Sequence, residues 1–315
     1  MREQIHLRHC ELSPSAQSGG PLSVSKLHAD EVEIDSSLVG GLLAAQFPRW
    51  ADLSLTLVTS QAGTSNVLYR LGEDMVVRLP RTPGAADSVA LESRWLSRLA
   101  PELPFAVPEV LGEGLPTDGY PLQWSVCRWL DGDDVLTNPD VDEHHAAIDL
   151  GRFIGALRKV DAEGPPAFRG GPLATRDAGV RAAVRDLGGT IDAAAATAAW
   201  EKALATPEWT GDPVWLHSDL LPGNLLARDG RLTAVIDFGA CGVGDPACDT
   251  MPVWTVLSAE TRPLFRAQVD VDDATWARGR GWALCFGLGA ADYYEVRNPV
   301  FAALGRRVVG EVLAD

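Results

Sequence analysis

The feature that most constrains this chain is a set of three polar residues at fixed intervals in an otherwise apolar stretch. Asp219 precedes Asn224 by five residues, and Asp237 follows Asn224 after thirteen more. The Leu-Pro-Gly turn at residues 221–223 lets Asp219 and Asn224 point into one cleft. The sequence between Asn224 and Asp237 predicts two short strands joined by an Arg-Asp-Gly turn at residues 228–230. The second strand would therefore deliver Asp237 beside Asn224.

These three side chains have the chemistry that a phosphoryl-transfer site needs. Asp219 is a candidate base, and the oxygens of Asn224 and Asp237 are hard ligands that suit Mg²⁺ bound to nucleotide phosphates. Any one of them alone is as well explained by hydrogen bonding to a buried loop, but the ordered set of three is not. His217 is expected to brace the loop by hydrogen bonding rather than to transfer a proton.

Composition narrows the class of protein. With 315 residues, 46% hydrophobic and 22% charged, the chain resembles a globular protein of one large domain or two lobes. We expect no membrane span and no signal peptide. Five scattered cysteines without a Cys-x-x-Cys motif favour the reducing cytoplasm over a disulfide framework or zinc site. The net charge of −16 disfavours nucleic acid and would attract cationic small molecules, although acidity can equally serve solubility alone.

The first 130 residues predict a small antiparallel sheet. Residues 1–25 contain Ser-, Gly- and Pro-rich stretches and are expected to form a flexible extension, with ordered structure beginning near Lys26. A short helix capped by Asp35 or Ser36 should end at Pro48. Strand patterns occupy residues 53–58, 66–71, 75–79, 109–112 and 122–127.

One helix in this region carries an unexpected charge. After a break at Pro83-Gly84, apolar residues recur at helical spacing over residues 87–99, and Glu92 falls on the same inward stripe. A carboxylate in that position costs free energy unless it is paired. We predict that its partner is Arg78, on the third strand.

Beyond residue 130 the sequence becomes mainly helical. Apolar stripes or Ala-rich segments occur near residues 150–160, 180–187, 191–204, 276–294 and 299–313. We therefore expect an α+β fold of two lobes: a sheet-rich lobe over residues 26–130 and a larger helical lobe over residues 131–315.

From about Lys26 onward the chain resembles the aminoglycoside phosphotransferase family, which are antibiotic kinases with a protein-kinase-like fold. The motifs that carry the resemblance are Ser65-Asn66-Val67-Leu68-Tyr69-Arg70-Leu71, Val76-Val77-Arg78-Leu79, Glu92, Trp129-Leu130-Asp131-Gly132, His217-x-Asp219 with Asn224, and Ile236-Asp237-Phe238-Gly239 continuing to Asp245-Pro246 and Asp249. The catalytic-loop and metal-loop motifs are the most specific of these.

The resemblance implies a kinase that uses Mg²⁺ and either ATP or GTP to phosphorylate a hydroxyl of a small molecule, often an antibiotic. Asp219 would accept the proton of the attacking hydroxyl or orient it. Asn224 and Asp237 would hold Mg²⁺, and Arg78, positioned by Glu92, would contact the α- and β-phosphates. Arg78 departs from the Lys usual in kinases, but it keeps the positive charge.

The resemblance also divides the lobes by role, with nucleotide bound by residues 26–130 and catalysis and substrate binding in residues 131–315. Backbone groups of Arg128 and Leu130 would face the purine, and Cys127 would line the back of that pocket. The loop Gly63-Thr64-Ser65 would cover the phosphates with N–H donors.

The acceptor is less well constrained. In this family, carboxylates of the helical lobe line the pocket when the substrate is a polyamine sugar. The available acids are Asp131, Asp133, Asp134, Asp292 and Glu295. Asp249, like Asp245, either holds the catalytic loop, which we favour, or faces substrate amines.

We therefore expect a cytoplasmic O-phosphotransferase, monomeric or homodimeric, that acts on an aminoglycoside or related antibiotic and so confers resistance. Two alternatives remain open at this point. One is a kinase of another small alcohol, such as a macrolide, a cyclic peptide antibiotic or a metabolite. The other is a catalytically silent nucleotide-binding protein, with Arg78 as the mark of lost function.

Overall fold

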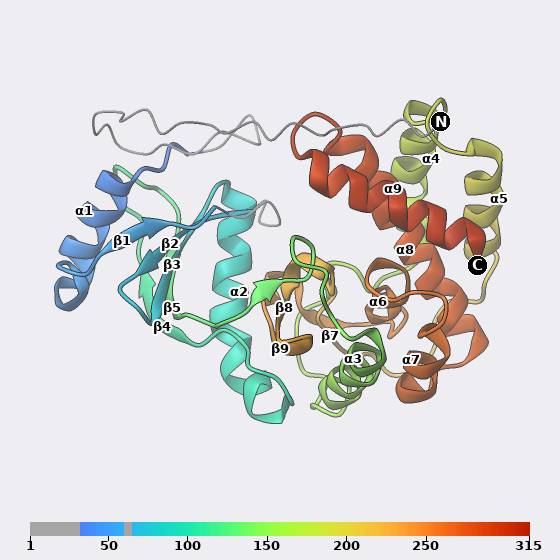
Figure 1. The fold of residues 1–315 in the computed structure, drawn as a ribbon, viewed down its shortest axis with the longest axis horizontal. Coiled ribbons are helices and arrows are strands. Elements are labelled where there is room, and N and C mark those ends of the chain that lie inside the picture. Colours follow the sequence, from blue (N-terminus) through green and yellow to red (C-terminus); the bar gives the residue numbers. More distant parts are fainter. Residues whose placement is uncertain (1–31, 60–64) are drawn as a thin grey trace, which may run out of the picture.

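The computed structural model describes residues 32–59 and 65–315. The predicted extension over residues 1–25 lies outside the described residues, as do Gly63 and Thr64 of the predicted phosphate-covering loop. The described chain forms a small lobe built on a sheet and a larger, mainly helical lobe (Figure 1). The two-lobed α+β architecture expected from the sequence is therefore confirmed.

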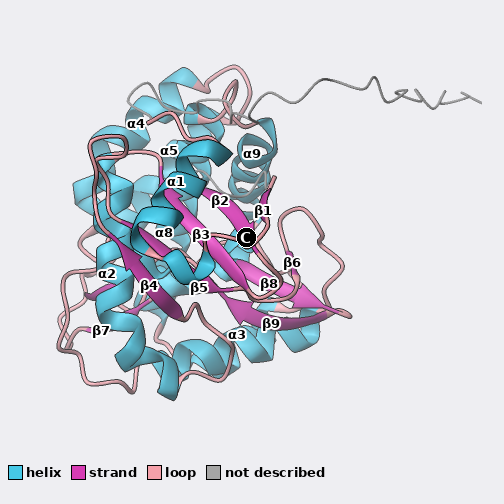
Figure 2. Cartoon of the chain, turned by 90° about the vertical axis from the view of Figure 1, so that its left-hand side faces the viewer, coloured by secondary structure: helices cyan, strands magenta, loops and turns pink. Residues whose placement is uncertain are grey.

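The small lobe is a five-stranded antiparallel sheet with the strand order β1-β2-β3-β5-β4. Its elements are α1 (Ser36–Gln46), β1 (Leu55–Leu57), β2 (Asn66–Leu71), β3 (Met75–Pro80), α2 (Pro83–Leu99), β4 (Val110–Gly114) and β5 (Trp124–Arg128). The five predicted strands are thus all present, with ends shifted by a few residues. Figure 2 shows α1 in front of this sheet.

The register of β2 and β3 decides which side chains face the larger lobe. Val67 pairs with Leu79 and Tyr69 with Val77, and all four are buried in the core that α1 covers. Because side chains alternate between the two faces of a strand, the neighbouring pair must point the other way. That pair is Leu68 and Arg78, and both line the cavity between the lobes.

Helix α2 begins four residues earlier than predicted. The Pro83-Gly84 pair was expected to interrupt the chain, but Pro83 is the first helical residue and Thr82 is the N-cap, accepting a bond from Ala85 N at 3.4 Å. Proline is tolerated there because the N–H that it lacks would have no partner in the first turn. Glu92 is buried on this helix with 1% of its surface exposed, as the apolar stripe predicts.

The larger lobe contains seven α-helices and five short strands among the described residues. The helices are α3 (Glu143–Leu157), α4 (Asp177–Asp186), α5 (Ala193–Leu204), α6 (Pro252–Thr255), α7 (Arg262–Val269), α8 (Asp273–Tyr293) and α9 (Pro299–Ala314). The strands are β6 (Asp133–Asp134), β7 (Val214–Leu216), β8 (Leu225–Arg228), β9 (Arg231–Val235) and β10 (Gly242–Gly244). No helix in the described part of the chain has both the length and the apolar character that crossing a membrane requires.

The β8–β9 hairpin is the element that brings the predicted site together. Its turn residues Asp229 and Gly230 have φ angles of 51° and 75°, the left-handed pair that a tight two-residue hairpin turn requires. Asn224 lies just before β8, and Asp237 follows β9 after one residue. A hydrogen bond of 2.9 Å from Ile236 N to Asn224 O holds the two ends side by side.

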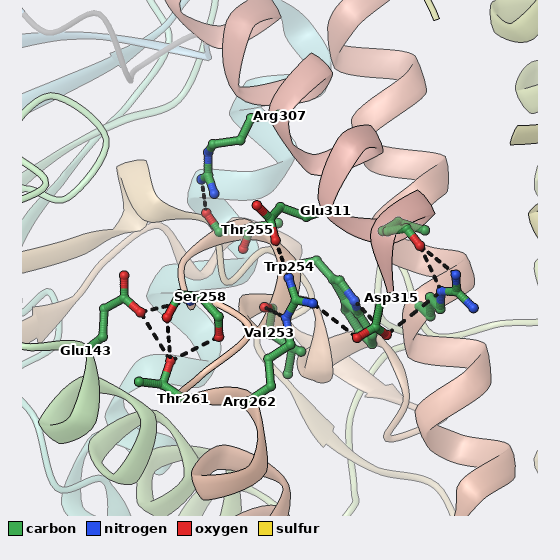
Figure 3. A network of polar contacts seen from close by, with 12 residues as sticks. Glu143, Val253, Trp254, Thr255, Ser258, Thr261, Arg262, Arg307, Glu311 and Asp315 are labelled. Atoms are coloured by element: carbon green, nitrogen blue, oxygen red, sulfur yellow. Dashed lines mark hydrogen bonds and ion pairs between the residues drawn. The ribbon is translucent and has the colours of Figure 1, made fainter. Parts of the chain in front are cut away.

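A polar network ties the C-terminal helix to the rest of the larger lobe (Figure 3). Arg262 is 6% exposed; it donates to Val253 O and to Asp315 Oδ1, both at 3.1 Å, and pairs with Glu311. Nearby, one oxygen of Glu143 accepts hydrogen bonds from Ser258 and Thr261. The bonds of Arg262 fix α9, and α9 carries part of the cavity wall described below.

Candidate active site

A cavity of about 800 Å³ lies between the two lobes. Six of the residues predicted to act in catalysis, nucleotide binding or metal binding line it: Ser65, Arg78, Leu130, Asp219, Asn224 and Asp237. The wall also contains Trp129 from the connection between the lobes, and Val300 and Phe301 from the start of α9. Residues far apart in the chain therefore converge on one space large enough for a nucleotide.

The catalytic loop is held in a conformation that a non-glycine residue rarely adopts. Ser218 has a φ of 69°, in the left-handed region. Its N–H and that of His217 each donate a hydrogen bond of 2.8 Å to the carboxylate of Asp249. Asp249 is fully buried, with 0% of its surface exposed. It therefore braces this loop and cannot contact a substrate, which corrects its inclusion among the candidate substrate ligands.

His217 links the two loops of the site through both ring nitrogens. Nε2 lies 3.0 Å from Ile236 O, and Nδ1 accepts the N–H of Asp219 at 3.2 Å. Since a carbonyl can only accept, Nε2 is the donor in this contact. The ring also packs edge-on against Phe238, with centroids 4.6 Å apart. This geometry matches the bracing role expected for His217.

Asp219 and Asn224 lie in direct contact inside the cavity. Asn224 Nδ2 donates to the backbone oxygen of Asp219 at 2.9 Å and to its carboxylate Oδ2 at 3.1 Å. The amide oxygen of Asn224 makes no hydrogen bond with a described residue and remains available as a ligand. Asp237 has a φ of 62°, and its side chain is 37% exposed at the cavity wall.

Arg78 connects the small lobe to this group. Its guanidinium bonds the buried carboxylate of Glu92, as the sequence predicts, and its Nη2 lies 3.6 Å from Asp237 Oδ1. Burial works against the Arg78 charge, but Glu92 is the main group that outweighs burial and raises the Arg78 pKa. Burial raises the pKa of Glu92, and Arg78 opposes that rise. The cation is therefore fixed in its charged form at the cavity edge.

The donor set suits a hard cation of the Mg²⁺ type. One carboxylate and one amide oxygen are few ligands for a metal, but Mg²⁺ commonly binds one or two protein oxygens together with substrate phosphates and water. Asp237 is accessible from the cavity, and the free amide oxygen of Asn224 belongs to the same wall. The residues present therefore fit such an ion.

The predicted purine pocket is only partly reproduced by the cavity lining. Leu130 lines the cavity, whereas Cys127 is buried behind it and Arg128 points to solvent, with its Nε 2.5 Å from Glu109. The N–H of Arg128 donates to Glu109 O at 2.9 Å, which leaves only its carbonyl for a ligand.

Trp129 is a cavity residue for which the sequence analysis named no role. It lines the cavity, its ring centre lies 3.9 Å from the guanidinium carbon of Arg70, and its Nε1 donates to Asp131 at 3.1 Å. A polar anchor at one edge and a cation over one face hold the ring in place. The motif Trp129-Leu130-Asp131-Gly132 contains this residue, but the sequence analysis gave its side chain no role; its position directly after β5 is the signal that could have done so.

Three of the predicted substrate acids lie outside the cavity lining. Asp131 has a 64% exposed side chain near Arg228, Glu295 pairs with Arg306 at 3.2 Å, and Asp292 is half-buried on α8. Burial, together with the nearby charges of Asp186 and Glu295, raises the pKa of Asp292. Asp133 and Asp134 do line the cavity, but both already accept bonds, from Asn138 and Thr137 respectively.

Arg169 is a second residue that the sequence analysis missed. It comes from the segment after α3, fifty residues before Asp219, and its Nη1 pairs with Asp219 Oδ1 and donates to Ser218 O at 3.0 Å. A lone arginine in a Pro- and Gly-rich loop carries no sequence signal for such a contact.

A two-lobed α+β fold with these groups in the cleft defines a protein-kinase-like phosphotransferase. A model of the phosphotransferase enzyme family matches residues 56–282. The chain belongs to that family, which confirms the resemblance and the expectation of an enzyme. A search of curated proteins finds no match.

Solved structures with the same fold include several antibiotic kinases. The GDP and kanamycin complex of APH(2")-IIia is 20% identical and has a TM-score of 0.68, covering 88% of this chain and 98% of its own. The apoenzyme of the macrolide 2'-phosphotransferase MphH from Brachybacterium faecium is 27% identical with a TM-score of 0.57, covering 85% and 97%. An ADP-bound aminoglycoside phosphotransferase, APH(2'')-Ib, is 15% identical with a TM-score of 0.57, covering 89% and 99%.

Proposed function

We propose that this protein transfers the γ-phosphoryl group of ATP or GTP to a hydroxyl of a small molecule, in the manner of an antibiotic kinase. The observation that carries the proposal is the convergence of Asp219, Asn224, Asp237 and Arg78 on one cavity. The nucleotide complexes among the similar structures support a nucleotide donor. Such a donor, with four free cysteines among the described residues, suits the cytoplasm.

Each residue has a role that follows from its position. Asp219 Oδ2 would accept the hydrogen bond of the acceptor hydroxyl and take its proton as the new P–O bond forms. Arg78, held charged by Glu92, would contact the nucleotide phosphates as they gain charge. Asn224 and Asp237 would hold Mg²⁺, which neutralises phosphate charge when bound. Trp129 and Leu130 would enclose the base.

The roles of the lobes follow from the same arrangement. We assign residues 26–130 to nucleotide binding, because Ser65 just before β2, Asn66 at the start of β2 and Arg78 on β3 line the cavity. We assign residues 131–315 to catalysis and acceptor binding, because Asp219, Asp237 and the start of α9 lie there.

An aminoglycoside is the first acceptor to test, since the chain has a net charge of −16 and Asp133 and Asp134 line the cavity. A neutral acceptor of the macrolide type is the second. It is supported by the apolar wall of Val300 and Phe301, and by the absence of Asp131, Asp292 and Glu295 from the lining. Phe301 extends this wall through Phe286, whose ring centroid is 5.8 Å away.

A panel of aminoglycosides, macrolides and cyclic peptide antibiotics, each with ATP and with GTP, tests the proposal. Mass spectrometry should detect one acceptor that gains about 80 Da, the mass of one phosphoryl group. Gain on a macrolide but on no aminoglycoside would select the second acceptor. Turnover of neither nucleotide with any hydroxylated acceptor would contradict the proposed function.

A further inference from the structure

Arg169 reaches the candidate base from a part of the chain that contributes no residue to the cavity lining. Its guanidinium bonds Oδ1 of Asp219, while Asn224 Nδ2 bonds Oδ2 of the same carboxylate at 3.1 Å. The two partners differ in charge: a guanidinium cation bonds one carboxylate oxygen, and a neutral amide bonds the other. Together they fix both the position and the plane of the carboxylate.

The side chain of Arg169 is enclosed rather than free in solvent. It is 19% exposed, and its guanidinium carbon lies 5.1 Å from the ring centre of Phe168 and 6.0 Å from that of Phe286. Aromatic faces attract a cation and exclude water from it. A charge-assisted bond in such a site is stronger and shorter than one between neutral groups.

The backbone of Arg169 does a different task from its side chain. Its N–H donates to Ser218 Oγ at 2.6 Å, and its carbonyl accepts from the same hydroxyl at 3.0 Å. These two bonds join the Arg169 segment to the catalytic loop and do not depend on the guanidinium. Removing the side chain breaks the contact with Asp219 and the bond from Nη1 to Ser218 O, but the two bonds to the Ser218 hydroxyl still attach the segment to the loop.

We propose that Arg169 is the positioning residue for Asp219: it holds Oδ1, so that Oδ2 is presented to the acceptor hydroxyl. The inference rests on the proposed function, because it assigns Asp219 to the acceptor. In the catalytic loop itself, residues 220–223 are Leu-Leu-Pro-Gly and provide no cation. Arg169 supplies that charge from a distant segment.

The test compares Arg169→Ala, Arg169→Gln and Arg169→Lys with wild type in the full chain, by steady-state kinetics with the acceptor identified by the panel. A misplaced reacting group costs about 100-fold in rate, so kcat of Arg169→Ala should fall by about 10- to 100-fold. The KM for nucleotide should stay within about twofold, because Arg169 does not line the nucleotide cavity. Arg169→Lys should recover part of kcat, and Arg169→Gln should not, because only Lys keeps the charge.

Arg176→Ala is the matched control. Arg176 lies in the same segment and also packs on Phe168, at 5.2 Å, but it donates to Phe168 O and makes no hydrogen bond or ion pair with Asp219. Its kcat should remain within about twofold of wild type. If Arg169→Ala does not fold, the Gln and Lys pair still measures the effect of the charge.

Three outcomes would overturn the role of Arg169: wild-type kcat in Arg169→Ala, a loss confined to KM, or equal kcat in the Gln and Lys variants. Failure of the proposed function looks different, because wild type itself would then phosphorylate no alcohol. In that case nucleotide hydrolysis by water, measured without acceptor, provides the same comparison of kcat. Equal hydrolysis by wild type and Arg169→Ala would then reject the inference.

Discussion

Nη2 of Arg78 lies 3.6 Å from Oδ1 of Asp237, which joins the sheet of the small lobe to the end of β9 in the larger lobe. The same guanidinium bonds Glu92 on α2. Three elements of the fold therefore meet at one cation. The distance between Arg78 and Asp237 depends on how the two lobes are placed, so a change in that placement would move the cation away from the candidate metal ligand.

Arg78→Ala should abolish most of the activity. Loss of a cation aimed at developing phosphate charge lowers kcat by about 100- to 1,000-fold. Arg78→Lys keeps the charge and should be less damaging, although one ammonium replaces the planar fork that reaches both Glu92 and Asp237. Steady-state kinetics of the two variants measures this, and wild-type kcat in Arg78→Ala would remove Arg78 from the site.

A second substitution should restore the stability that Arg78→Ala loses without restoring its activity. Arg78→Ala leaves Glu92 buried without its partner, which costs about 3 to 5 kcal/mol. Arg78→Ala combined with Glu92→Gln removes that uncompensated charge, so the double variant should unfold at higher denaturant than the single one. It should remain inactive. Recovery of activity in the double variant would mean that Arg78 acts only on stability.

Gly239→Ala should displace α2, because residue 239 packs against Ser88 of that helix. A Cβ at residue 239 would lie 2.6 Å from Ser88 Cβ on α2, and neither group can move freely. Overpacking of this kind costs about 1 to 3 kcal/mol, and a shift of α2 would displace Glu92. We expect a lower unfolding midpoint and a higher KM for nucleotide.

Gly289→Ala is the control for that variant. Gly289 lies within α8, and an added Cβ there meets no atom within 4 Å. Alanine should therefore stabilise the helix by about 0.5 to 1 kcal/mol with unchanged kinetics. Equal effects of the two substitutions would show that α2 and residue 239 are not tightly packed.

Glu143 should make the stability depend on acid pH. Burial raises the pKa of Glu143, but hydrogen bonds from Ser258 and Thr261 outweigh burial and hold the pKa below its usual value of 4.5 (Figure 3). The unfolded state then binds more protons below pH 4.5, so this stabilisation is present above that pH and is lost as the pH falls through the folded-state pKa.

Glu143→Gln tests this dependence, because the amide keeps the shape but does not titrate. At pH 7 the variant should be less stable than wild type by about 1 to 2 kcal/mol, the effect of losing hydrogen bonds to a charged group. The difference should shrink as the pH falls below 4.5. Denaturant unfolding at several pH values measures it, and a difference independent of pH would contradict the assignment.

Short-range patterns in the sequence predict much of this fold. The alternation in β2, the turn at Asp229 and Gly230, and the inward stripe of α2 are local, and the structure has each of them. The Arg78–Glu92 pair could be predicted because a carboxylate on an apolar stripe needs a cation, and Arg78 was the candidate on the nearby strand.

Contacts between distant segments could not be predicted in the same way. Arg169 contacts Asp219 because the loop after α3 packs against the catalytic loop. No pattern in the fifty residues between them predicts that contact. Helix α7 and the short strands β6, β7 and β10 were missed for a related reason. They have two to eight residues each, too few for a periodic pattern to emerge.

The central claim is that Asp219 is the base of a phosphotransferase, and Asp219→Asn tests it most directly. The amide keeps the size of the side chain but cannot take the proton of the acceptor hydroxyl. With nucleotide and the acceptor from the panel, kcat should fall by about 100- to 10,000-fold while nucleotide affinity, measured by calorimetry, stays within about threefold. Phosphorylated product formed by Asp219→Asn at the wild-type rate would contradict the account.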